Sequence, residues 1–264
     1  MDKLLIKNVH IIDPSQSLNC ISDIMIEDGV ISKLGKNLTV DCKTIYASPG
    51  LVDMHVHLRD PGFTDKEDIM TGCKSAAAGG VTSLLAMPNT KPAVDTPETV
   101  KYILDKAKNA DARVYVVGAI TKGLKSEEMT DIPALKEAGI IALSDDGRPV
   151  VNTKFMAEAM QLADELGLTV TAHCEDLFLA DGGKINEGKV SKLLGIKGIP
   201  AAAEDTGTAR EIAIAAAYGT AIHICHVSTA TSVALVRDAK ARGVRVTAET
   251  CPHYFTFTEN ELLK

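Results

Sequence analysis

Three polar side chains, His55, His57 and Arg59, recur at every second position of the stretch LVDMHVHLRD. Side chains alternate along a strand, so these three are expected on one face, with apolar residues on the other. Two imidazoles one residue apart can bind a single metal ion, and a planar guanidinium nearby is suited to bidentate binding of a carboxylate. The alternatives are two structural histidines and a salt bridge from Arg59 to Asp60 or Asp65.

Further candidate metal ligands follow three later apolar runs. Asp146 follows IIALS, His173 ends LTVTAH and His226 lies at the end of the run AIHICH. If these runs are parallel strands of a barrel, their carboxyl ends lie at the edge where barrel enzymes place their chemistry. Four strands would then bring one carboxylate and four imidazoles to one point, a ligand set that suits zinc.

Alternation along the strands predicts which neighbours share a face with these ligands. In IIALSDD, Asp146 is expected on the side of the small residues, with Ile141 and Leu143 on the opposite side. His223 lies three residues before His226, so it is expected to face the other way as a packed or capped structural residue.

Other residues near these runs are assigned structural roles or left open. Asp145 is expected to accept hydrogen bonds from the loop at Gly147. Cys174 and Cys225 adjoin ligand positions and are expected to point away from them. His253 follows the seventh run in a turn at the same end of the sheet, so a site role and a structural role both remain open.

The order of apolar runs indicates an α/β protein. From residue 1 to about residue 46 the pattern is alternating and β-like, with a hairpin turn at Asp28 and Gly29. From Leu51 onward, seven short apolar runs each precede a helical stretch, which favours a (β/α)8 TIM barrel over an open doubly wound sheet. The clearest helical stretches are 65–78, 97–109, 153–166 and 202–217, the second with Thr96 as its N-cap.

The runs divide the chain into a β segment at residues 1–50 and a barrel domain at residues 51–264. The run that should form the eighth strand is missing before Lys264. Either the barrel closes unusually or the sequence is a piece of a longer protein. The second alternative is favoured, because an open barrel edge exposes unpaired backbone groups. The segment 181–200 follows the fifth run, so it is expected on the catalytic face. It could be a mobile cover or a solvated loop, and both alternatives remain open.

Composition and charge indicate an ordinary soluble protein, with the cytoplasm as its expected location. The 264 residues carry a net charge of −7 with no Lys/Arg block, which argues against nucleic acid or an anionic membrane as a partner. No apolar run is long enough to span a bilayer or to form a signal peptide. Six cysteines lie singly without a CxxC pair, as expected for reduced thiols.

The motifs HVHLRDPG, AMPNTKP, SDDG, HCED and CHVST together resemble those of the class I, or bacterial-type, dihydroorotases of the amidohydrolase superfamily. The similarity runs in order along essentially the whole chain. HxH alone would indicate only the superfamily, whereas MPNT with SDDG narrows the resemblance to this family. It implies an amidohydrolase-type TIM barrel, with the N-terminal segment as the first part of a small β-sandwich.

The resemblance also implies roles for single residues. The implied ligands of one or two zinc ions are His55, His57, Asp146, His173 and His226. Asp146 would bridge two ions, whereas hydantoinases, allantoinases and the other dihydroorotase class use a carboxylated lysine at that place. Arg59 and Asn89 would hold the substrate carboxylate, the alternative for Asn89 being a turn before Pro92.

The implied reaction is the reversible cyclisation of N-carbamoyl-L-aspartate to L-dihydroorotate in pyrimidine biosynthesis. Its general acid/base would be an aspartate at the end of the eighth strand, beyond Lys264, so this stretch alone is expected to be nearly inactive. A homodimer and an association with aspartate transcarbamoylase are further implied. The alternatives are a hydantoinase-type or allantoinase-type hydrolase and a non-catalytic subunit that supports aspartate transcarbamoylase.

Overall fold

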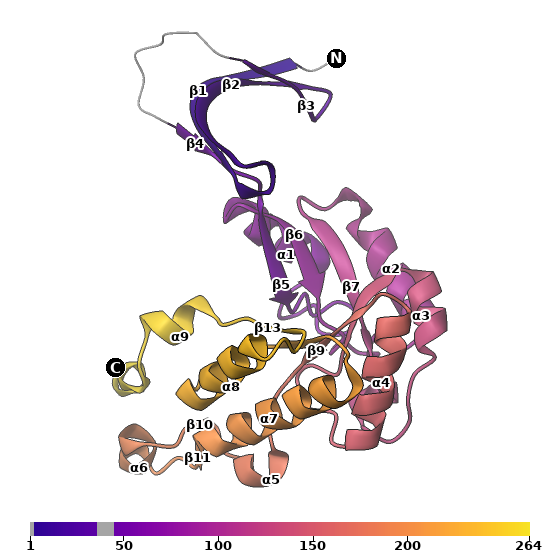
Figure 1. The fold of residues 1–264 in the computed structure, drawn as a ribbon, viewed down its shortest axis with the longest axis vertical. Coiled ribbons are helices and arrows are strands. Elements are labelled where there is room, and N and C mark those ends of the chain that lie inside the picture. Colours follow the sequence, from indigo (N-terminus) through magenta and orange to yellow (C-terminus); the bar gives the residue numbers. More distant parts are fainter. Residues whose placement is uncertain (1–2, 36–44) are drawn as a thin grey trace. The chain divides into compact units, whose positions relative to one another are not determined.

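The computed structural model describes residues 3–35 and 45–264, and the chain divides into the units Met1–Leu51 and Val52–Lys264 (Figure 1). The first unit holds a four-stranded sheet in the order β3-β2-β1-β4. Its elements are β1 (Lys3–Asp13), η1 (Pro14–Gln16), β2 (Leu18–Glu27), β3 (Val30–Gly35) and β4 (Ile45–Ala47). Asp28 and Gly29 join β2 to β3 with positive φ values of 51° and 79°, as a two-residue hairpin turn requires.

A curled sheet of seven strands forms the centre of the second unit, in the order β13-β12-β9-β8-β7-β6-β5 (Figure 1). Each of the seven apolar runs forms one strand, and neighbours with a described register are parallel. The strands are β5 (Leu51–Val56), β6 (Val81–Ala86), β7 (Arg113–Ala119), β8 (Ile140–Ser144), β9 (Thr169–Ala172), β12 (Ile222–Ile224) and β13 (Val246–Ala248). Their carboxyl ends therefore lie at one edge.

Helices connect these strands, as the repeated pattern predicts. The helices are α1 (Ile69–Ala78), α2 (Pro97–Lys106), η2 (Ala107–Asn109), η3 (Lys122–Leu124), α3 (Ile132–Ala138), α4 (Thr153–Glu165), α7 (Ala201–Tyr218), α8 (Ala230–Ala241), α9 (Pro252–Thr256) and η4 (Glu259–Leu263). Thr96 caps α2 by accepting from Thr99 N–H, as expected. The helix predicted from residue 65 begins at Ile69, because Asp68 accepts from two amides of the first turn.

The main core lies between the sheet and its helices. Strand residues that are fully buried there include Leu84, Val116, Leu143, Val170 and Ile224. Helix residues of the same cluster include Ile103, Met160 and Ile212. Strands β6, β7, β8, β9 and β12 therefore bury side chains against the helices, which holds their carboxyl ends in a fixed order at one edge of the sheet.

Ile141 breaks the alternation predicted for IIALSDD. Strands β7 and β8 pair Val116 with Ile140 and then Val117 with Ala142, so Ile141 is an extra residue in a β-bulge. Its side chain is 39 % exposed, whereas Ile140 is buried in the core. Alternation alone cannot reveal a bulge, so the prediction for Ile141 is wrong.

The segment after β9 is ordered rather than a plain loop. It contains α5 (Leu177–Ala180), β10 (Ile185–Asn186), α6 (Lys189–Leu194) and β11 (Gly198–Ile199). Strands β10 and β11 form a small parallel sheet of their own. Residues 177–199 make up this segment, the β9 excursion.

Two loops that follow β5 and β6 mesh closely. Lys91 N–H donates to Pro61 O at 2.9 Å. Gly62 has φ of 95°, and a Cβ at this position would lie 2.1 Å from Lys91 O. Only glycine allows this approach, which fixes the loops that carry Arg59 and Asn89 relative to each other.

A comparison of two glycines tests this contact. Gly62→Ala adds both left-handed strain and a clash, whereas Gly80→Ala adds strain alone, because Gly80 has φ of 82° and no atom within 4 Å of its Cβ position. We expect Gly80→Ala to cost about 1–2 kcal/mol in the free energy of unfolding. Gly62→Ala should cost about 1–3 kcal/mol more. Equal losses in urea unfolding would contradict the close contact between the loops.

Candidate metal centre

Asp146 lies at the centre of the polar cluster, two residues beyond the end of β8. Its amide N–H donates to Ser144 Oγ at 3.0 Å, and that hydroxyl donates to Thr171 O at 2.7 Å on the next strand. The Asp146 side chain is only 2 % exposed. A buried carboxylate needs charged or hydrogen-bonding partners, and four imidazoles supply them.

The two carboxylate oxygens of Asp146 face two different pairs of histidines. Oδ2 lies 3.3 Å from His55 Nε2 and 3.4 Å from His57 Nε2. Oδ1 lies 3.4 Å from His173 Nδ1 and 3.4 Å from His226 Nε2. Each group of two nitrogens and one oxygen could hold a metal ion. The structure thus brings together all five residues predicted as metal ligands.

The charges of this cluster depend on one another. Burial disfavours a charged His55, but hydrogen bonds with Asp146, Cys225 and Glu249 outweigh it and raise the pKa of His55 to about 12. Burial also disfavours a charged His173, but its hydrogen bond with Asp146 outweighs the burial and raises the pKa of His173 to about 9. The pKa of Asp146 falls well below its usual range, because the histidine hydrogen bonds outweigh its burial. Without metal, protons therefore balance the buried carboxylate.

Asn89 orients His57 from behind. His57 Nδ1–H donates to Asn89 Oδ1 at 2.8 Å, which leaves Nε2 of the same ring facing Asp146. The Asn89 amide nitrogen lies against Gly147, where a Cβ would come within 2.8 Å of it. Asn89 therefore has a support role that the sequence did not predict, and it also lines a cavity beside the cluster.

Arg59 lies beyond the end of β5 with φ of 60°, so strand alternation does not extend to it. Its predicted alternative partner Asp60 is buried and engaged elsewhere, 2.6 Å from Lys106 Nζ, and accepts from Tyr102 Oη at 3.0 Å. Within the described ranges, Arg59 forms no ion pair. Arg59 lines the same cavity as His57.

A cavity of about 730 Å³ opens beside the cluster. The β9 excursion supplies part of its wall, through Asn186, Glu187 and Ile199. The other lining residues include His57, Arg59, Asn89, Asp146, Gly147, His173, Glu175, Glu204, His226 and Tyr254. A small polar molecule in this space would therefore contact Arg59 and the metal-binding groups together.

Glu204 of α7 fixes the loop that carries His226. Its Oε1 accepts from Ser228 N–H at 3.0 Å and from Thr229 N–H at 3.1 Å. His226 itself has φ of 38°, two residues beyond the end of β12 at Ile224. Strand alternation therefore does not relate His226 to His223, contrary to the prediction.

His223 and Cys225 lie behind His55 rather than facing away from the cluster. His223 is 4 % exposed, with Nδ1 2.8 Å from Thr247 Oγ1 and Nε2 3.3 Å from Glu249 Oε2. Cys225 forms a potential ligand group with His55 and Glu249, so its predicted outward orientation is wrong. Cys174, by contrast, is buried in the main core.

Two acidic residues near the ligands were not singled out from the sequence. His55 Nδ1–H donates to Glu249 Oε1 at 2.7 Å, and His173 Nε2 lies 3.7 Å from Glu175 Oε2. Glu249 directly follows β13, so its place at the end of the seventh run was the available signal. Glu175 follows His173 by two residues, beyond the end of β9.

The remaining candidates have structural surroundings. Asp145 accepts from Ile120 N–H at 2.8 Å and Thr121 N–H at 2.9 Å, so it caps the loop after β7 rather than the loop at Gly147. His253 is exposed in α9, with its ring edge-on to Tyr254, and belongs to neither metal-binding group.

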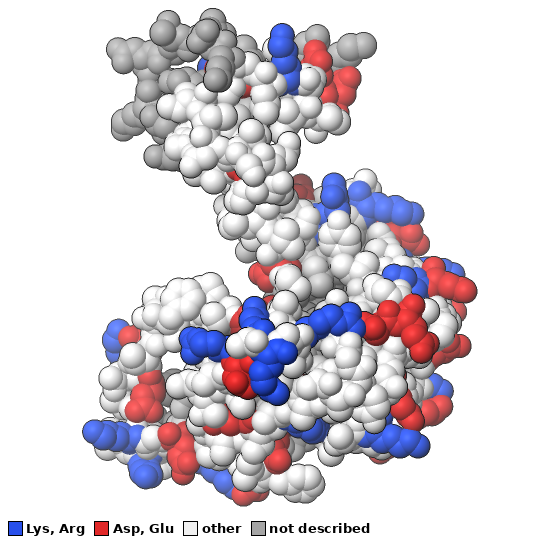
Figure 2. Space-filling view, in the orientation of Figure 1, with Lys and Arg blue, Asp and Glu red and all other residues white. Residues whose placement is uncertain are grey.

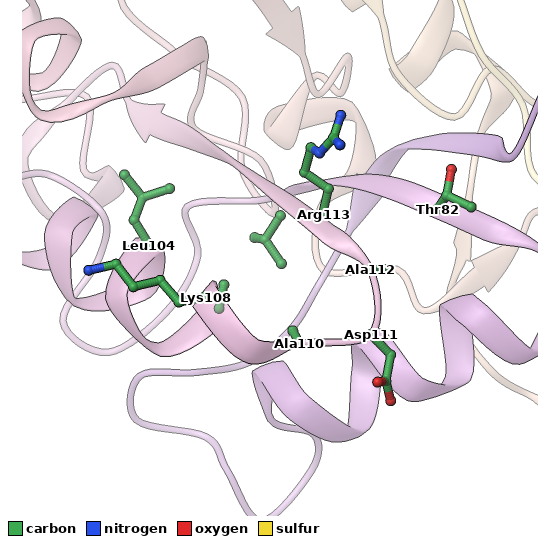
Figure 3. Close-up of a pocket in the computed structure, with 9 residues that line it drawn as sticks. Thr82, Leu104, Lys108, Ala110, Asp111, Ala112 and Arg113 are labelled. Carbon is green, nitrogen blue, oxygen red and sulfur yellow. The ribbon is translucent and has the colours of Figure 1, made fainter. Parts of the chain in front are cut away.

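A second hollow of about 440 Å³ lies at the opposite edge of the sheet, at the start of β6 and β7 (Figure 3). The charged side chains of Lys108, Asp111 and Arg113 point in different directions there. They form no converging group, so this hollow offers no alternative to the Asp146 cluster.

The fold of this chain is shared with solved hydantoinases. An L-hydantoinase from Arthrobacter aurescens superimposes with a TM-score of 0.79 at 20 % identity, over 97 % of this chain and 60 % of that enzyme. A D-hydantoinase from Thermus sp. superimposes with a TM-score of 0.73 at 28 % identity, over 97 % of this chain and 59 % of that enzyme.

Sequence relatives narrow this class. Residues 45–232 match the family model described as dihydro-orotase-like, and the chain belongs to that family. A dihydroorotase of Ruminiclostridium cellulolyticum is 51 % identical over 98 % of this chain. One of Acetivibrio thermocellus is 51 % identical over 97 %. The chain spans 62 % of the length of each of these relatives.

Neighbouring aspartates provide a matched test of the site. Asp146→Asn removes a carboxylate that both ligand groups share, so affinity for a divalent metal should fall by more than about 100-fold. Asp145→Asn should leave metal binding intact and instead lower the free energy of unfolding by about 1–3 kcal/mol, because a buried acceptor is lost. Metal titration and urea unfolding of both variants measure the two effects. Undiminished metal binding by Asp146→Asn would contradict the assignment.

Metal binding should release protons. His55 and His173 have raised pKa values, about 12 and about 9, so both imidazoles are protonated at pH 7.5 without metal. A metal ligand must be a neutral imidazole, so binding expels protons and affinity rises with pH. Release of two protons would change the apparent Kd by about 100-fold per pH unit. Calorimetry in buffers of different ionisation enthalpy measures the release, and heats that are independent of buffer would refute it.

Proposed function

We propose that the whole protein to which this chain belongs is a dihydroorotase, which interconverts N-carbamoyl-L-aspartate and L-dihydroorotate in pyrimidine biosynthesis. Membership of the dihydro-orotase-like family and identities near 50 % to dihydroorotases support the reaction. The observation that carries the proposal is the Asp146 carboxylate between two histidine pairs, beside a cavity that Arg59 lines.

The metal we propose is zinc, as one or two ions. Two ligand atoms at about 2.0–2.2 Å from a tetrahedral zinc ion lie about 3.3–3.6 Å apart. The distances of 3.3–3.4 Å between the Asp146 oxygens and the four histidine nitrogens fit that spacing. His173 Nδ1 and His226 Nε2 are 3.0 Å apart, so these two rings would have to separate slightly to hold an ion. Each carboxylate oxygen would serve one group, which makes Asp146 the bridging residue. When bound, zinc supplies polarisation of the ring amide carbonyl and a water of lowered pKa.

The residues of the cavity bind and orient the substrate. Both reaction partners carry carboxylates, and the Arg59 guanidinium can bind one of them in bidentate fashion. Asn89 accepts from His57 through Oδ1, so its amide N–H groups remain available as donors to the same carboxylate. The β9 excursion forms part of the cavity wall and would lie against a bound substrate.

The general acid/base stays a prediction. The family resemblance places it on an aspartate at the end of an eighth strand. Asp145 is held by three hydrogen bonds from Ile120 and Thr121 and is 3 % exposed, so it is not free to exchange protons with a substrate. His253 lies outside both ligand groups.

Several further assignments remain part of this proposal. We propose that the curled seven-stranded sheet belongs to a (β/α)8 barrel domain at residues 51–264, and the N-terminal sheet to a small β-sandwich. A homodimer, an association with aspartate transcarbamoylase and a cytoplasmic location stay predictions. Among the described residues, no helix has the length and apolar character needed to cross a membrane.

On the face shown in Figure 2, acidic and basic side chains of the second unit are interspersed.

A hydantoinase activity is the second candidate, because solved hydantoinases share the fold. The bridging position favours the first candidate, since it is an aspartate in this chain and no lysine ends the stretch IIALSDD. A purely structural subunit is disfavoured, because four buried or half-buried imidazoles around one carboxylate serve no packing purpose.

Substrate discrimination tests the proposal. The zinc-loaded whole protein should hydrolyse L-dihydroorotate and leave hydantoin and allantoin unchanged. Arg59→Lys should raise the KM for dihydroorotate by about 10-fold or more, because lysine cannot form the bidentate contact. Arg113→Lys, in the hollow at the opposite edge of the sheet, is the control and should have no effect. Faster hydrolysis of hydantoin than of dihydroorotate would overturn the assignment.

A further inference from the structure

Behind His55, on the side away from Asp146, lies a chain of three polar side chains. His55 Nδ1–H donates to Glu249 Oε1 at 2.7 Å, and Glu249 Oε2 lies 3.3 Å from His223 Nε2. His223 Nδ1 lies 2.8 Å from Thr247 Oγ1. A threonine hydroxyl that donates to Nδ1 leaves the histidine proton on Nε2, where it faces Glu249.

We propose that Glu249 and His223 are positioning residues that strengthen metal binding by the group of His55, His57 and Asp146. The inference rests on the metal centre of the proposed function and adds two residues to it. A carboxylate that accepts from the far nitrogen of a metal-binding imidazole fixes its tautomer and its orientation and raises its basicity.

Burial makes this chain of contacts rigid. The His223 side chain is 5 % exposed and that of Glu249 is 20 % exposed. Because β12 and β13 are neighbouring parallel strands that pair His223 with Thr247, their spacing fixes both side chains. Glu249 N–H donates to Ile224 O at 3.0 Å, which ties the backbone beyond β13 to β12 as well. If Glu249 turned away from His55, it would lose the 2.7 Å hydrogen bond from Nδ1 and the 3.3 Å approach to His223 Nε2.

Three of the four histidines can be compared by the group that lies behind each ring. His57 donates to the neutral amide of Asn89, whereas a carboxylate stands 2.7 Å behind His55. Behind His173 the nearest carboxylate is 3.7 Å away, too far for a direct hydrogen bond. The group of His55 and His57 therefore has the stronger support and should bind the first zinc ion more tightly.

Glu249 acts through His55 rather than as a ligand. Its separation of 2.7 Å from Nδ1 is shorter than the edge of about 3.3–3.6 Å between two ligands of a tetrahedral zinc ion. That distance is typical of a hydrogen bond to a charged acceptor. Cys225 completes a possible ligand group with His55 and Glu249. Substitution of Cys225 therefore distinguishes Glu249 as a metal ligand from Glu249 as a positioning residue.

Zinc affinity of the whole protein, measured by competition with a chromophoric chelator, tests the inference. Glu249→Gln should weaken the tighter zinc step by about 10–100-fold while both ions still bind at high concentration. His223→Asn should weaken the same step, and Thr247→Val should do so to a smaller extent. Glu175→Gln is the matched control and should leave the tighter step unchanged.

Three other results of the zinc measurements would contradict the inference. Zinc binding by Glu249→Gln that equals that of the unaltered protein would overturn the positioning role alone. Loss of one whole zinc equivalent in both Glu249→Gln and Cys225→Ser would make Glu249 a ligand and also overturn it. No zinc binding by the unaltered protein would overturn the metal centre itself and this inference with it. Thermal unfolding of the metal-free variants separates these effects from a loss of fold.

Discussion

The buried carboxylate of Asp146 is the constraint on which the rest of the site depends. A carboxylate that is 2 % exposed is costly unless positive charge and hydrogen bonds surround it. Four imidazoles satisfy it, two at each oxygen, and the same arrangement is what a pair of metal ions would require. Protons and metal ions therefore compete for one set of ligands.

The parallel sheet supplies this arrangement by placing the carboxyl ends of distant segments at one edge. Strands β5, β8, β9 and β12 each bring a ligand, and buried polar contacts hold the ends in place. Ser144 links β8 to β9, Asp145 caps the loop after β7, and Glu204 fixes the loop of His226. The acidic residues that are not ligands thus maintain the geometry of those that are.

Much of this was predictable from residue types and spacing, because strand periodicity and the common edge of parallel strands follow directly from sequence. The five ligand candidates and the seven strands were found in this way. Three features were not predictable from that pattern. The bulge at Ile141 shifts the alternation, the left-handed backbone of His226 ends it, and Glu249 meets His55 across 194 positions of the chain. Each depends on tertiary contacts that a local pattern does not contain.

Anomalous diffraction from zinc-loaded crystals of the whole protein tests the central statement most directly, because it locates the ions without reference to activity. We expect two zinc peaks about 3.5–4 Å apart, one on each side of the Asp146 carboxylate. One peak should contact His55 and His57, and the other His173 and His226. A zinc peak between His55, Cys225 and Glu249, with none at Asp146, would contradict a centre bridged by Asp146.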